Sequence, residues 1–140
     1  MPTVTTNYFR DQLAKGNINL SGDTYFVSLM DEFVTTAIST IDQLKAQSAW
    51  GDISAAYENS AANYSAAEIV GVPISTTTGN IVKWDGADIT WSSVTLSAAG
   101  HCLYRSDGLI VGFVEYSSIA DAVNGDITIQ WNAGGIMNIT

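Results

Sequence analysis

The chain has 140 residues, and its 14 aspartates and glutamates outnumber its 5 lysines and arginines, giving a formal net charge of -9. Sequence-independent binding to nucleic acid or to an anionic membrane is disfavoured, because both need clustered basic residues and the ones present are scattered. Charged residues make up 14% of the chain, against roughly 25% in typical domains, which favours a neutral-polar assembly subunit over a free cytosolic enzyme.

The N-terminus is expected to hold a flexible arm and a short helix. Residues 1–6 carry a proline and β-branched residues without a core pattern, so they should be loose, and their removal should spare the fold. Residues 7–15 place aromatic side chains about one turn before a leucine, which predicts an amphipathic helix with Asn7 or Thr6 as its cap and Gly16 as its stop.

The middle of the chain, residues 31–72, is expected to be a helical and extended connection. Two short predicted strands, 18–20 and 24–30, precede it. Hydrophobic residues from Phe33 to Leu44 recur at helical spacing, which predicts a surface helix or a partly helical loop. The rest of the connection is rich in Ala, Ser and Asn without a clear period, and we expect it to be extended.

Residues 73–140 predict a series of short strands separated by turn residues. The predicted strands are 81–84, 89–91, 94–96, 101–104, 110–116, 127–131 and 136–139. Asp107-Gly108 predicts a hairpin turn, and Asn124-Gly125 predicts a second sharp reversal. Short strands at this spacing are typical of an antiparallel β-sandwich or barrel. We therefore predict one mostly β domain over residues 1–140, sandwich or barrel-like, with a short N-terminal helix and a partly helical insertion.

The strand 127–131 has the clearest alternation in the chain. Ile127, Ile129 and Trp131 share one face, while Thr128 and Gln130 share the other. Because strand side chains alternate with a period of two, this pattern predicts one buried face and one solvent-exposed face.

Nucleophilic catalysis has one candidate pair, His101 and Cys102. Adjacent residues of a strand point to opposite faces, so the two cannot form a nucleophile-base dyad within that strand. We interpret His101 as a structural histidine and Cys102 as a small core residue.

Metal binding has a similarly weak signal. Asp85 and Asp88 could present two carboxylates to Ca²⁺, but Ca²⁺ needs about six to eight oxygens, so turn-forming aspartates are the favoured interpretation. Asp31-Glu32 is better explained by the favourable position of negative charge at a helix N-terminus. The sequence predicts no cofactor and no metal.

The four tryptophans divide into two groups. Trp84, Trp91 and Trp131 stand beside Ile or Val in strand patterns, which favours core packing over a sugar-binding platform. Trp50 lies outside a clear strand and is the tryptophan we expect to contact a partner.

Four blocks of sequence carry a family resemblance. They are Tyr8-Phe9-Arg10 through Leu13 to Leu20 with Asp23-Thr24 and Val27 to Met30, Trp50-Gly51-Asp52-Ile53 with Tyr57-Glu58 and Tyr64, Asp88-Ile89-Thr90-Trp91-Ser92-Ser93-Val94-Thr95-Leu96, and Asn124-Gly125 to Ile136-Met137. Together they resemble a family of small tailed-bacteriophage virion proteins, which serve as capsid decoration, head or tail structural proteins. None of the blocks is a catalytic signature.

The resemblance implies a non-enzymatic virion protein, and we expect a capsid decoration (cement) protein that binds the outer capsid surface and stabilises the shell. A tail or fibre component for host attachment is the alternative, and an enzyme carried on the virion ranks third. The expected partner is the major capsid protein, with self-association in which a trimer is favoured, on the virion surface after assembly in the host cytoplasm. The candidate partner contacts are Tyr8, Phe9, Phe33 and Trp50.

Overall fold

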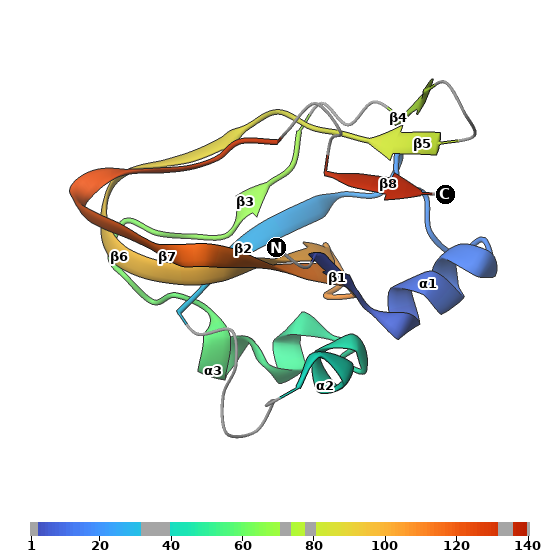
Figure 1. Cartoon of the computed structure of the whole chain (residues 1–140), viewed down its shortest axis with the longest axis horizontal. Coiled ribbons are helices and arrows are strands. Elements are labelled where there is room, and N and C mark those ends of the chain that lie inside the picture. The colour runs from blue at the N-terminus through green and yellow to red at the C-terminus, as the bar shows by residue number, and fades with distance from the viewer. Residues whose placement is uncertain (1–2, 32–39, 71–73, 78–80, 132–135, 140) are drawn as a thin grey trace.

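The computed structural model describes residues 3–31, 40–70, 74–77, 81–131 and 136–139. These residues form mainly strands, with a few short helices (Figure 1). The elements in chain order are β1 (Thr3–Thr5), α1 (Asn7–Ala14), β2 (Tyr25–Met30), α2 (Ile41–Lys45), the 3-10 turn η1 (Trp50–Asp52), α3 (Ser54–Tyr57), β3 (Ala67–Glu68), β4 (Ile74–Thr77), β5 (Ile81–Trp84), β6 (Ile89–Arg105), β7 (Ile110–Ile129) and β8 (Met137–Ile139).

The strands form two antiparallel sheets. The larger has the order β1-β7-β6-β2-β3, and the smaller has the order β4-β5-β8. The larger sheet is open, so the mostly β fold class is confirmed only at that level, and no closed barrel is formed by the described strands.

The β6–β7 hairpin dominates the fold and is strongly bent (Figure 1). Its closed end is the predicted Asp107-Gly108 turn, where Gly108 has φ +92. Farther along, the strand register shifts near Ser93 (φ 56) and Asn124 (φ 48), and residues 116–119 lie opposite Ala99 alone. Such bulges bend a hairpin and increase its twist.

Two predictions for this region are wrong. The predicted strands 89–91, 94–96 and 101–104 are parts of one continuous strand, β6, and strand 110–116 continues to residue 129 as β7. Asn124-Gly125 lies within β7 instead of reversing the chain. The reason is that Asn124 adopts the positive φ that its sequence context favours, but β7 continues to pair with β6 on both sides of it. A positive φ inside a paired strand produces a bulge and not a turn.

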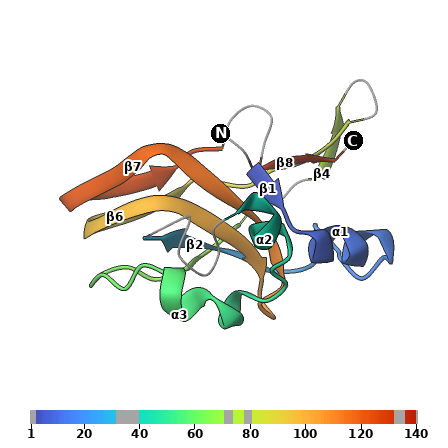
Figure 2. The same cartoon turned by 60° about the horizontal axis from the view of Figure 1, so that its bottom comes forward.

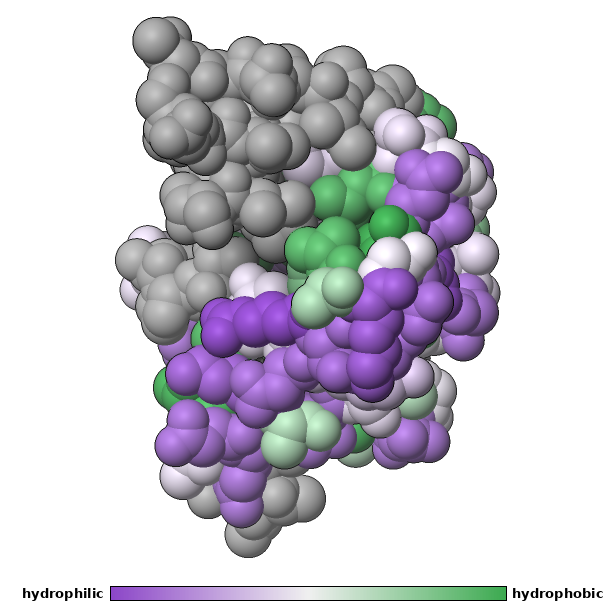
Figure 3. Space-filling model, turned by 90° about the vertical axis from the view of Figure 1, so that its right-hand side faces the viewer, coloured by the Kyte–Doolittle hydropathy of each residue, from purple (hydrophilic) through white to green (hydrophobic). Residues whose placement is uncertain are grey.

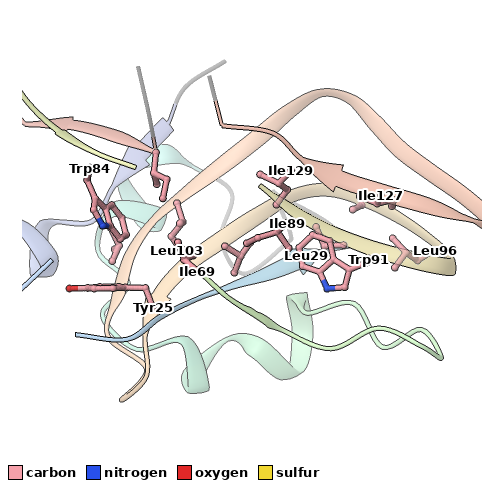
Figure 4. Packing of buried hydrophobic residues seen from close by; sticks show 14 of the residues in the cluster. Tyr25, Leu29, Ile69, Trp84, Ile89, Trp91, Leu96, Leu103, Ile127 and Ile129 are labelled. Carbon is pink, nitrogen blue, oxygen red and sulfur yellow. The ribbon is translucent and has the colours of Figure 1, made fainter. Parts of the chain in front are cut away.

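One hydrophobic core lies on the inner side of the bend (Figure 4). Ile89, Trp91, Ile127 and Ile129 come from one half of the hairpin, and Leu103 comes from the other (Figure 4). Tyr25 and Leu29 of β2 and Trp84 of β5 join them, so both sheets contribute to one core. The predicted burial of Ile127, Ile129, Trp84 and Trp91 is confirmed, and Trp131 packs against this core while half-buried.

A second core lies on the opposite face of the larger sheet, where α2, η1 and α3 pack (Figure 2). It combines Cys102, Ile110 and Phe113 of the hairpin with residues from these short helices and from β1 and β2. The helical part of the predicted connection is therefore confirmed for 41–45, whereas the expected extended segment begins with two helical turns, η1 and α3.

The N-terminal helix has the predicted cap and stop. Thr6 accepts a hydrogen bond from the Phe9 backbone N–H at 3.2 Å, and Gly16 has φ +74 just after the helix. The predicted strand 18–20 is wrong, because Asn19 Oδ1 accepts hydrogen bonds from the Ser21 and Gly22 N–H groups and folds this segment into a turn.

The flexible arm predicted for residues 1–6 is wrong for Thr3 to Thr6. Thr3–Thr5 pairs with β7, Val4 is buried, and Thr6 Oγ1 donates to the Ile110 carbonyl at 2.7 Å. The two residues before Thr3 lie outside the described part of the chain. Backbone pairing and a buried valine hold this segment, so removing residues 1–6 should destabilise the fold.

Replacing Gly112 by alanine is expected to displace β1. A Cβ at this position would overlap the Val4 carbonyl oxygen, which belongs to backbone and cannot rotate away. We expect a loss of about 1–3 kcal/mol in unfolding free energy and faster amide exchange at Thr3 to Thr6. Gly51→Ala is the matched control, because its added Cβ meets nothing within 4 Å. Unchanged exchange at Val4 in Gly112→Ala would show that β1 does not depend on this close approach.

Candidate interaction surface

The structure separates the predicted partner contacts. Tyr8 is 43% exposed on α1, whereas Phe9, the next residue, is 1% exposed and belongs to the inner core. Adjacent helical residues point in different directions, and Phe9 takes the position that faces the sheet. Phe9 is therefore wrong as a partner contact, Tyr8 stays a prediction, and Phe33 lies outside the described residues.

Trp50 is also wrong as a partner contact. It is 4% exposed and stacks on Tyr104 with ring centroids 5.7 Å apart. Its backbone N–H donates to the Gly108 carbonyl at 2.8 Å, so η1 is joined to the hairpin turn. This pairing is between segments distant in sequence, and it buries an indole that no local strand pattern predicts.

The surface around α1 combines polar and hydrophobic areas. Figure 3 shows this end of the molecule, with a hydrophobic area beside a band of hydrophilic residues. Leu13 and Ile18, on and just after α1, are half-buried hydrophobic residues that pack against the inner core. Tyr8 adds an exposed aromatic ring to the same helix, whereas the ring of Phe9 is buried and does not contribute to this surface.

Arg105 fixes the closed end of the hairpin. Its guanidinium contacts Asp107 at 2.7 Å and Asp23 at 3.2 Å, and Nη1 donates to the Asn17 carbonyl at 2.9 Å. The hydrogen bond from Arg105 lowers the pKa of Asp107. The same contacts raise the pKa of Arg105, mainly through Asp107. This group of charges therefore ties the hairpin turn to the segment between α1 and β2.

His101 and Cys102 point to opposite faces of the sheet, as predicted. Cys102 belongs to the second core, where burial raises the pKa of its thiol. His101 lies among the inner residues, with Nδ1 2.9 Å from Tyr116 Oη and the Trp131 ring edge-on at 5.9 Å. Burial lowers the pKa of His101 to about 3, and its Nε2 has no hydrogen-bond partner. The imidazole is therefore neutral at physiological pH.

A polar network joins β2 to the segment after α3. Ser28 Oγ donates to Glu58 Oε1 at 2.8 Å and lies 3.2 Å from Tyr104 Oη. Tyr64 Oη accepts the Leu29 backbone N–H at 2.7 Å and lies 3.5 Å from the same carboxylate oxygen. Burial raises the pKa of Tyr64, so its hydroxyl is neutral at physiological pH. Tyr64 thereby supplies an acceptor for a backbone N–H of β2 beyond Phe26 and Val27, the residues that pair with β3.

Of the predicted aspartates, Asp85 makes a local bond, whereas Asp88 and Asp31 bond residues distant in sequence. Asp85 Oδ1 accepts from the Gly86 N–H, Asp88 Oδ1 accepts from the Trp131 N–H, and Asp31 accepts from Asn59 Nδ2. Within the described ranges, no group of three or more His, Cys, Asp or Glu side chains could hold a metal ion. None of the helices described here is long and apolar enough to cross a membrane.

The most exposed hydrophobic side chains lie elsewhere, on β7 near the bend. Val123 is 85% exposed and Ile119 is 61% exposed, more than the other exposed large hydrophobic residues of the described chain. Sequence reasoning missed them because alternation assigns large hydrophobic residues to the core. The sequence does contain a signal for their exposure. In a strand, Ile119 and Val123 share a face with the charged Asp121, whereas Ala120 and Ala122 lie on the other face.

Comparisons of the chain with family models, curated proteins and solved structures found no match.

Proposed function

We propose that this chain is a non-enzymatic structural protein of a tailed-bacteriophage virion, and specifically a capsid decoration protein that binds the outer surface of the shell. The virion assignment rests on the four sequence blocks that resemble phage structural proteins. The major capsid protein is the proposed partner, and the location is the capsid surface after assembly in the host cytoplasm. Self-association, with a trimer favoured, belongs to the same proposal.

One observation favours an architectural role over catalysis: the groups that could perform chemistry join segments of the fold. His101 contacts Tyr116 across the hairpin, and Arg105 joins the hairpin turn to Asp23. Ser28 joins β2 to Glu58. Such contacts stiffen a body built from two sheets, which we take to be sandwich-like because both sheets contribute to the inner core.

A cement protein stabilises a shell by mass action and by added contact area. Binding across joints between shell subunits adds interface that internal pressure must break, and it favours the assembled state in proportion to occupancy. The low share of charged side chains, 14%, suits broad polar contact with little desolvation of charge.

The alternative is a tail or fibre component, and one observation favours it. Phe26 and Tyr104 are half-buried and stacked with ring centroids 6.0 Å apart, and Tyr104 lies near the Glu58 carboxylate through Ser28. Partly exposed aromatic rings beside a carboxylate are a chemistry that suits sugar binding. Affinity for host-surface glycans would support this alternative.

The proposal predicts that the purified protein binds saturably to particles that lack it and raises the temperature at which they release DNA. The expected cause is added interface on the shell, so the rise should track occupancy. Co-sedimentation gives occupancy, and dye access to DNA during heating gives the release temperature. Heat-unfolded protein is the control. Particles that are stable without the protein but fail to adsorb to cells would instead support the tail alternative.

A further inference from the structure

The hairpin bend presents hydrophobic side chains without a described partner strand. Val123 and Ile119 lie on the part of β7 beyond Val114, where β1 has ended. Among the described residues, only β6 pairs with this part of β7. We call residues 115–126 the hairpin knob.

The knob is held in shape by bonds across the hairpin. Ser97 Oγ donates to Asp121, Ser93 N–H donates to Asp126 Oδ1 at 3.0 Å, and Asn124 N–H donates to Thr95 Oγ1 at 2.9 Å. These bonds fix the bulges that project Ile119 and Val123. Because little order has to be gained on binding, a preorganised surface loses less entropy than a loose one.

The charged side chains of the knob are all negative. Glu115, Asp121 and Asp126 are its charged residues, and neither β7 nor β6 before Arg105 contains a lysine or arginine. A partner surface that fits must therefore supply positive charge around an apolar centre.

A second copy of this chain fits this requirement poorly. Lys15, Lys45 and Arg105 are already paired with carboxylates of their own chain, and the five basic residues are scattered. Addition of a partner strand to the β7 edge also fits poorly, because residues 116–119 bulge opposite Ala99 and interrupt the regular row of backbone groups.

We propose that the hairpin knob inserts Ile119 and Val123 into an apolar pocket rimmed by lysine or arginine side chains on a different protein of the virion. This inference rests on the proposed function and names the surface that would perform it. The two aliphatic side chains act as anchors, and the three carboxylates orient the approach.

The test compares matched variants in binding to particles that lack the protein. Ile119→Ser with Val123→Ser should weaken binding at least about tenfold, because both anchors are lost. Val70→Ser is the control, since Val70 is also exposed, at 55%, but its carbonyl accepts the Ala87 N–H, outside residues 115–126 of the knob. The double variant and the Val70→Ser control should both keep the wild-type melting temperature, because the replaced side chains are exposed.

A charge variant tests the proposed rim. Glu115→Gln, Asp121→Asn and Asp126→Asn together keep the side-chain oxygens that accept hydrogen bonds from Ser97 and Ser93. The triple variant should associate more slowly and lose most of the salt dependence of binding. Salt dependence equal to that of the wild type would overturn the basic rim.

The outcomes separate the two proposals. If wild-type protein does not bind the particles, the proposed function is wrong and this inference falls with it. If wild-type protein binds and the serine variant binds equally well, only the knob is wrong. If the serine variant instead loses self-association while its monomer still binds, the occupant is a second copy and the inference is overturned. Should the serine variant unfold, a photoreactive residue at position 123 must crosslink to a different virion protein, and its failure to do so in bound particles would overturn the inference.

Discussion

Replacing Trp84 by alanine is expected to lower the unfolding free energy by about 3–5 kcal/mol. Trp84 is fully buried, and its indole meets Tyr25 edge-on with ring centroids 4.9 Å apart (Figure 4). Since β5 carries Trp84 and β2 carries Tyr25, this contact joins the smaller sheet to the larger one. Chemical denaturation with a fluorescence or circular dichroism signal measures the change.

The matched variant is Trp84→Phe, expected to cost about 1–2 kcal/mol. The indole Nε1 has no hydrogen-bond partner, so phenylalanine loses contact area but no hydrogen bond. A loss below about 1 kcal/mol in Trp84→Ala would show that the two sheets do not depend on this shared core.

Acidification is expected to destabilise the protein through His101. Its pKa is about 3 in the folded protein because burial disfavours the charged imidazole, and it is about 6.5 in the unfolded chain. The unfolded state therefore binds more protons below pH 6.5, and the stability contribution is lost as pH falls from about 6.5 towards 3. The full effect, reached once the pH is below about 3, is about 5 kcal/mol.

The measurement is denaturant unfolding at several pH values between 7 and 4 for wild type and His101→Gln. Glutamine does not titrate and can still bond the Tyr116 hydroxyl, so the variant should show a flatter dependence on pH in this window. Carboxylates act equally in both proteins and cancel in the comparison. Equal slopes for the two proteins would mean that the imidazole is accessible to protons in the folded state.

Features that depend on neighbouring residues could be predicted from the sequence. Thr6 and Gly16 bound α1 as their side-chain chemistry and backbone freedom require, and Gly108 provides the positive φ of the hairpin turn. The alternation of Ile127 and Ile129 with polar residues correctly gave the buried face. These signals act over one turn or one strand, which is the range that a local pattern covers.

Features set by distant pairing could not be predicted in this way. Asn124 permits either a reversal or a bulge, and the continued pairing of β7 with β6 decides for the bulge. Trp50 is buried because η1 bonds to the hairpin turn, and β1 is ordered because β7 offers it an edge. The exposure of Val123 follows from the same bend. The candidate surface is therefore formed by Ile119 and Val123 and not by Phe9 and Trp50, because the three-dimensional fold buries the latter two and exposes the former.

Electron microscopy of intact particles tests the central proposal most directly, by comparing particles that carry this protein with particles that lack it. A decoration role predicts additional density on the outer face of the shell, placed over joints between capsid subunits, with the hairpin knob directed at a shell protein. Density confined to the tail or its fibres would contradict the decoration role and support host attachment. Identical maps of the two kinds of particle would contradict a place in the virion altogether.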